Sequence, residues 1–193
     1  MPSITKTLRL LGLTTLGVLS ITAHPLTLAA QAAGDDDGTE LPTLRAARLS
    51  GSIDLDGKLD ESVWQDAEPA TRFIQLDPWE GEPGSEETRV FVLYDDQALY
   101  VGAVMFDRSP VSTRLGRRDG YLMDSDKFAV SLDAYNDHRT GFMFEVNPSG
   151  VRMDQALTNG RDEHGDSSWD PVWEAATQIT EDGWTAELRI PLS

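Results

Sequence analysis

The sequence predicts an all-β protein, an antiparallel β-sandwich of about eight strands with one short helix. Three observations predict this fold. Apolar residues alternate with a period of two in several short segments, turn dipeptides separate these segments at nearly regular spacing, and only one segment carries a helix-start signal. The 193 residues suffice for one such domain.

The strand signals fall into three hairpins and some shorter pieces. In the first hairpin, residues 88–94 (TRVFVLY) and 98–106 (ALYVGAVMF) flank an Asp-Asp-Gln turn. The other expected strands are 127–135 with 141–146, then 151–157 after the turn at 147–150, and finally 172–179 with 184–190. Residues 52–55 and 73–76 are expected to be short extended pieces, and 158–171 a polar loop.

The one helix signal begins at Asp60, which suits an N-cap, and we expect the helix to run to about Ala67. Trp64 within it, and Trp184 within the last strand, are expected in the core. Trp173 continues in period two with Ala175, so it is also assigned to the core.

The first 32 residues have the pattern of a secretory signal peptide. Lys6 and Arg9 precede an apolar run at 10–21, and Ala30-Gln31-Ala32 is an A-x-A cleavage site. An N-terminal membrane anchor is the alternative. Residues 33–44 are expected to be an acidic linker and 45–193 the sandwich domain. The chain is therefore expected to be exported to the periplasm, the outer membrane or the cell exterior.

The charge and the cysteine count narrow the classes of partner. The formal net charge is −17, so nucleic acid is a poor partner, because it requires a basic surface. Calcium, a neutral sugar or adaptation to high salt are all compatible with this acidity. The chain has no cysteine, so export without disulfides fits a bacterial periplasm or surface.

Four motifs, in order along residues 49–193, resemble the family 9 carbohydrate-binding module. They are 55–61 (LDGKLDE) with Trp64, 92–101 (VLYDDQALYV), Asp126 with the following strand to Asp133, and 183–191 (GWTAELRIP). A narrower resemblance, carried by 117–119, 133–142, 144–150 and 169–174, is to large bacterial proteins. In those proteins this module precedes a β-rich region associated with the outer membrane.

This resemblance implies an exported, non-catalytic module that binds polysaccharide or oligosaccharide during carbohydrate catabolism or uptake. It also implies a C-terminal β-rich region in a longer parent protein, which could itself hydrolyse glycosyl bonds. Sugar-binding members clamp the sugar between two tryptophans. At the position of the first clamp tryptophan this sequence has Met123, with Tyr121 two residues before it. The second clamp tryptophan would come after the 183–191 motif, and the given sequence reaches Ser193 there. The closing strands are therefore expected after Ser193 or from elsewhere.

Sugar sites combine a flat aromatic ring with planar polar side chains that bind hydroxyls in pairs. The predicted carbohydrate-binding residues are loop aromatics and polar groups near them: Trp169, Tyr121, Arg118, Asp126, Asn147 and Trp79. Arg118 is expected to bind sugar hydroxyls, with Asp126 orienting it. The alternative role for Arg118 is an ion pair with Asp119 or Asp126. Asn147 could instead form a turn, and Trp79 could pack on an edge strand.

Other functions stay open at this stage. A purely structural module is favoured by the missing clamp tryptophan. A hydrolase would need two carboxylates that no motif singles out. A b-type haem sandwich would need ligands such as Met105, Met123, Met143, His138 or His164, although Met143 fits a core position better. The sequence assigns no catalytic residue, no metal ligand and no cofactor. The alternative is a calcium ion bound by the acidic segment 162–166.

Overall fold

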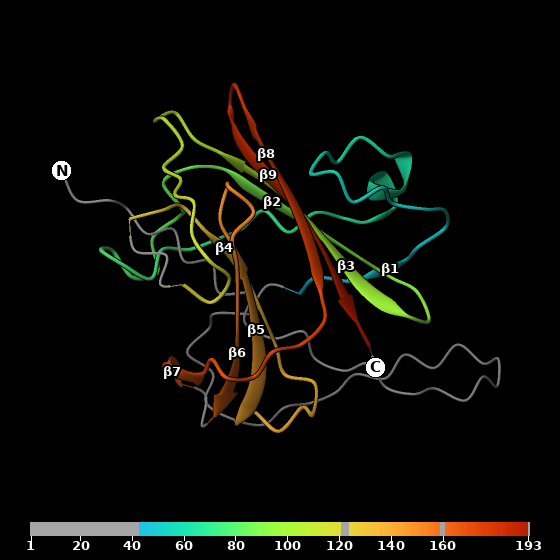
Figure 1. Cartoon of the computed structure of the whole chain (residues 1–193). Helices are drawn as coiled ribbons and strands as arrows, with labels where there is room; N and C mark the ends of the chain where they lie inside the picture. The colour runs from blue at the N-terminus through green and yellow to red at the C-terminus, as the bar shows by residue number, and fades with distance from the viewer. Residues whose placement is uncertain (1–42, 121–123, 159–160, 193) are drawn as a thin grey trace.

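The computed structural model describes residues 43–120, 124–158 and 161–192, with the backbone alone for 161–164, and is all-β (Figure 1). Two sheets face each other, as the sequence predicted for a sandwich. The predicted signal peptide and nearly all of the linker lie outside the described residues. No helix in the described part of the chain is long and apolar enough to cross a membrane.

The first sheet has five strands in the order β1-β2-β3-β9-β8. All pairs are antiparallel except the two-residue β1, which runs parallel to β2. The strands are β1 (Ala47–Arg48), β2 (Thr88–Tyr94), β3 (Ala98–Phe106), β8 (Glu174–Thr180) and β9 (Gly183–Pro191). Both hairpins predicted in this region, at 88–106 and 172–190, are confirmed.

The second sheet has four antiparallel strands in the order β4-β5-β6-β7. They are β4 (Phe128–Leu132), β5 (Thr140–Val146), β6 (Arg152–Thr158) and β7 (Arg161–Asp166). The last of these corrects the prediction of a loop at 158–171. The stretch TNGRDEHGD has no apolar alternation to signal a strand, and its pairing with β6 identifies it as one.

The core lies between the sheets and follows the predicted alternation. Trp173 and Trp184 belong to it, which confirms their assignment. The aliphatic and aromatic side chains that line it from the two sheets include Val90, Val92, Val101, Leu188, Phe128, Val130, Phe144 and Val146. Each fully buried side chain of this kind contributes about 1.5–3 kcal/mol, so this interface holds the sheets together.

The predicted helix is present but shorter. It is a 3-10 helix, η1 (Ser62–Asp66), and Trp64 within it is buried as expected. The N-cap position belongs to Glu61 and not to Asp60, and it makes no capping bond through its side chain. The Glu61 carboxylate instead accepts bonds from the Asp54 N–H at 2.8 Å and from the Trp64 indole at 3.2 Å.

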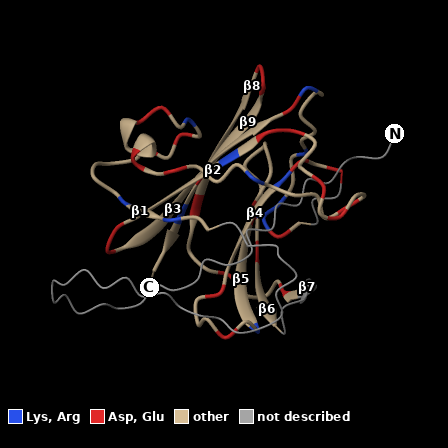
Figure 2. Cartoon of the chain, turned by 180° about the vertical axis from the view of Figure 1, so that it is seen from behind, with Lys and Arg blue, Asp and Glu red and all other residues tan. Residues whose placement is uncertain are grey.

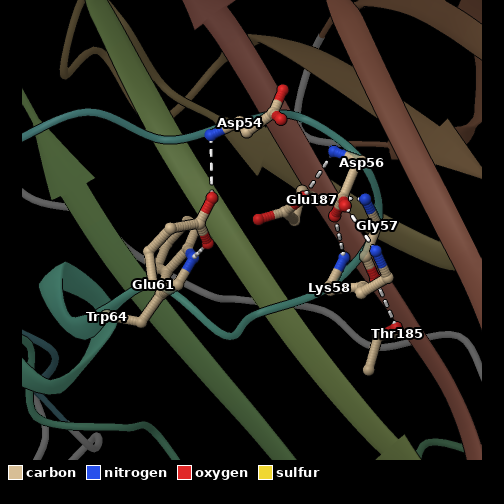
Figure 3. A network of polar contacts seen from close by, with 8 residues as sticks. All are labelled: Asp54, Asp56, Gly57, Lys58, Glu61, Trp64, Thr185 and Glu187. Atoms are coloured by element: carbon tan, nitrogen blue, oxygen red, sulfur yellow. Dashed lines mark hydrogen bonds and ion pairs between the residues drawn. The ribbon is translucent and has the colours of Figure 1, made fainter.

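The segment 54–58 forms a loop over the outer face of β9, where the sequence predicted a strand at 52–55 (Figure 3). The buried Glu187 on β9 accepts N–H bonds from Asp56 at 3.1 Å and Gly57 at 2.8 Å. Thr185 donates to the Gly57 carbonyl at 2.6 Å. Gly57 has a φ of 88°, and a Cβ there would lie 2.6 Å from the Thr177 backbone. Only glycine therefore fits this close approach.

Candidate functional site

Four aromatic rings form a continuous row from the solvent into the core at one end of the four-stranded sheet. Tyr135 is 71% exposed, and its ring centroid lies 6.3 Å from that of Phe142. Phe142 lies 4.6 Å from Trp169 with an angle of 30° between the rings, close to offset stacking. Trp169 also meets the buried Phe144 edge-on at 5.7 Å. The outer part of this row, Tyr135, Phe142 and Trp169, is called the aromatic platform below.

The local sequence explains the platform. Phe142 and Phe144 are two apart on β5, so both point to the inner face of the sheet. Tyr135 is carried by the turn between β4 and β5, and Trp169 by the connection between β7 and β8. Trp169 and Phe142 are half-buried, so each keeps part of its ring at the surface.

Arg118 is bound to the two residues that follow Trp169, and three acceptors hold its guanidinium. Its Nη2 lies 2.7 Å from Asp154 Oδ1 and 2.7 Å from Asp170 Oδ1. The same nitrogen donates to the Pro171 carbonyl at 2.9 Å. Because Asp170 follows Trp169 directly, Arg118 fixes the connection that carries the ring.

Asp154, on β6, anchors this arrangement from inside the protein. It is fully buried, and its Oδ1 also accepts a 2.9 Å bond from the Trp173 indole. Its second oxygen, Oδ2, is buried and has no hydrogen-bond partner among the described residues. Burial disfavours the charged form of Arg118, but the bond to Asp154 and the nearby carboxylates outweigh it and raise the pKa of this guanidinium.

The expected partner of Arg118 was Asp126, and this prediction is wrong. Asp126 is buried, and its carboxylate accepts the Ser112 N–H at 2.8 Å. The register of the second sheet pairs Asp154 with Phe144, which places Asp154 on the inner face where Arg118 can reach it. The expected ion pair with Asp119 exists only as a longer contact of 3.7 Å.

Asn147 is fully buried and stabilises the turn at residues 147–150, which was the alternative role considered for it. Its Oδ1 accepts N–H bonds from Ser149 at 3.0 Å and Val151 at 2.9 Å. Its Nδ2 donates to the Arg114 carbonyl at 2.7 Å. A residue with both ends of its amide bonded inside the protein has little left to offer a ligand.

The two remaining candidates lie apart from the platform or outside the described residues. Trp79 is 67% exposed in a hairpin at residues 73–84, so it does not pack on an edge strand. Tyr121 and Met123 lie outside the described residues, as do the side chains at 161–164 within the alternative calcium segment. The backbone of that segment is the strand β7.

Sequence reasoning missed Phe142, Tyr135, Asp154 and Asp170 as members of the site. The alternation of Phe142 with Phe144 was visible in GFMFEV, but the ring that stacks on it is 27 positions away along the chain. Of the alternative haem ligands, the three whose side chains the structure describes do not converge: Met105 and Met143 lie in separate apolar clusters, and His138 is exposed. No group of three His, Asp or Glu that could hold a metal occurs among the described residues.

A family model described as "Carbohydrate family 9 binding domain-like" matches residues 55–193. The chain belongs to this family. The resemblance of the sequence motifs is thus confirmed. Two motifs characteristic of the family, at 55–61 and 183–191, meet in the Glu187 network, so their role in this member includes holding the fold.

Solved structures support the same fold for this family member. One is a carbohydrate-binding module family 9 from Caldicellulosiruptor kristjanssonii in complex with cellotriose, 22% identical, with a TM-score of 0.54 over 77% of this chain and 68% of that one. The same module in complex with glucose gives equal identity and TM-score over 77% and 70%. A proposed carbohydrate-binding protein from Bacteroides uniformis ATCC 8492 is 12% identical, with a TM-score of 0.56 over 77% and 72%. No curated protein is significantly similar to the chain.

Proposed function

We propose that the chain binds an oligosaccharide or polysaccharide on the aromatic platform, without catalysis of its own. The observation that carries this proposal is the half-buried Trp169 beside the fixed Arg118–Asp170 pair. A sugar has an apolar C–H face and a rim of hydroxyls, so it needs a ring to stack on and paired polar groups next to it. The platform and the ion pair supply both.

The polar half of the site is well suited to hydroxyl recognition. Asp170 is 70% exposed, so its carboxylate can accept from a ligand while Arg118 holds it in place. Arg118 is one-third exposed, and its hydrogen bonds within the described residues run from Nη2, so Nη1 can still donate to a ligand. The related modules bound to cellotriose and glucose make a β-linked glucan the first ligand to test.

Replacement of Trp169 by Ala is expected to weaken binding of cello-oligosaccharides about tenfold, because a stacked aromatic contact contributes about 1 kcal/mol or more. The measurement is a calorimetric titration of the purified chain with cellotriose and xylotriose. The matched control is Trp79→Ala, which removes an exposed tryptophan that is not part of the aromatic platform and should leave sugar affinity unchanged.

Two results would contradict the proposal. In the first, neither sugar binds at millimolar concentration, which favours a purely structural module. In the second, Trp79→Ala abolishes binding while Trp169→Ala does not, which moves the site to the hairpin.

We propose as well that the chain is exported and serves polysaccharide catabolism or uptake as part of a longer outer-membrane protein. The leader pattern at residues 1–32 and the resemblance to such proteins support this proposal. Fractionation of the native cells, with the N-terminal residue of the mature protein read by mass spectrometry, tests it. A protein found only in the cytoplasm with an intact leader would contradict it.

A further inference from the structure

Residues 73–84 form a small hairpin that exposes an unusual amount of apolar surface. Ile74 faces Pro83 across it, and the Gln75 N–H donates to the Glu82 carbonyl at 2.7 Å. Ile74 is 66% exposed, Leu76 47% and Trp79 67%. Large apolar side chains gathered on one exposed segment indicate a binding surface.

The hairpin is also purely acidic. Asp77, Glu80 and Glu82 are all exposed, and residues 73–84 contain no Lys or Arg. We call residues 73–84 the acidic hairpin. A surface that is both apolar and negative fits a partner surface that is apolar and positive. The chemistry therefore excludes an anionic membrane or a nucleic acid as its occupant.

The chain itself carries a surface of that complementary kind. The loop 108–118 holds four of the 16 basic residues and no Asp or Glu, in a chain of net charge −17. Arg108 and Arg118 pair with carboxylates outside the loop, so Arg114 and Arg117 supply its outward positive charge. Within it, Leu115 is 89% exposed and stands between the exposed Arg114 and Arg117. Arg114 makes one loose surface contact with Asp124 at 3.5 Å. We call residues 114–117 the basic loop.

The two surfaces lie on the same side of the molecule. Both the hairpin and the connection from β3 to β4 project to the left in Figure 1 and to the right in the reverse view of Figure 2. Their bases are joined where Arg108 donates to both carboxylate oxygens of Glu86 at 3.0 Å. A two-fold axis on this side can therefore set each hairpin against the basic loop of a second copy.

We propose that the chain forms a two-fold homodimer in which the acidic hairpin of each copy binds the basic loop of the other. In a two-fold interface every contact occurs twice, so two copies of the small hairpin–loop contact contribute to the affinity of the dimer. Leu115 meets the apolar ridge of Ile74, Leu76 and Trp79, while Arg114 and Arg117 face the hairpin carboxylates. This inference does not depend on sugar binding, because the contact is built from residues 73–84 and 114–117, which include neither Arg118 nor Trp169.

The test uses charge reversal and mixing, measured by sedimentation velocity of the purified chain over a concentration series. The wild-type protein is expected to move from monomer to dimer as concentration rises, and to dissociate when salt is raised from about 0.05 M to about 0.5 M. R114E/R117E makes both patches acidic, and E80K/E82K makes the hairpin basic. Each variant alone is expected to stay monomeric, and their equimolar mixture to restore a salt-sensitive dimer.

All four positions are exposed, so the variants should keep their fold, which circular dichroism and the melting temperature check. A wild-type chain that is monomeric at all concentrations overturns the proposal, whatever else the hairpin contacts. A dimer that survives R114E/R117E also overturns it, because the copies then meet elsewhere. Failure of the mixture to associate while the wild type does is the third contrary result.

Discussion

Asp154→Ala is expected to lower the free energy of unfolding by about 3 kcal/mol. Removing one partner of a buried charge pair is costly because the other group is left without compensation. Here the truncation leaves both the Trp173 indole and one contact of Arg118 unpaired inside the protein. Arg118 keeps Asp170 and some access to water, which places the loss toward the lower end of the range for buried pairs. Urea unfolding followed by tryptophan fluorescence measures it.

The control for this prediction is Asp170→Ala, which removes the exposed partner of the same arginine. Because that carboxylate is 70% exposed, its loss should cost less than about 1 kcal/mol. Asp154→Asn, which keeps an acceptor for the indole but loses the charge, should fall between the two. Equal losses for Asp154→Ala and Asp170→Ala would show that the buried carboxylate does not anchor the site.

The stability of the protein is expected to fall as pH rises from about 5 to 8, because of Glu187. Burial, followed by the nearby charges of Glu61 and Asp56, raises the pKa of this carboxyl to about 7, against the effect of its two N–H bonds. A raised pKa means that the folded state favours the protonated form. The stabilisation is therefore complete below the unfolded value of 4.5 and is lost as pH rises through 7, about 3 kcal/mol in all.

Glu187→Gln isolates this effect, since it keeps an acceptor for the Asp56 and Gly57 N–H groups and cannot ionise. The difference in melting temperature between wild type and variant should change across pH 5 to 8 and level off on either side. Glu145 also has a raised pKa through burial, but it is present in both proteins and cancels in the difference. Parallel curves for the two proteins would contradict the assignment.

The hairpins could be predicted from the sequence because each carries its own evidence, alternating apolar residues on both sides of a turn. β7 could not, because its residues are polar throughout and carry no alternation, so only the pairing with β6 reveals the strand. The helix at Trp64 was recognisable, but its cap was not, because Glu61 bonds to Asp54 and to the indole ring and not to the helix backbone.

Two residues of the candidate site could be predicted from the local sequence, but the residues that bind them could not. Trp169 and Arg118 stood out locally, as a tryptophan in a polar loop and an arginine in a loop. Their partners depend on which face of a strand points inward, and alternation alone leaves that choice open. Asp154 sits in the polar series of β6, and only its register with Phe144 places it in the interior. Asp126 lies closer to Arg118 in the sequence than Asp154 does, but its carboxylate accepts the Ser112 N–H instead.

The central claim is that sugar binds at Trp169, and the five tryptophan indole N–H signals of a nitrogen-15 spectrum test it directly. Each signal is assigned by single Trp→Phe substitutions, and cellotriose is added to millimolar concentration. The account predicts that the Trp169 signal moves in a saturable way while those of Trp64, Trp79 and Trp184 stay in place. A saturable shift of Trp79 with Trp169 unmoved, or no indole shift at all, would contradict it.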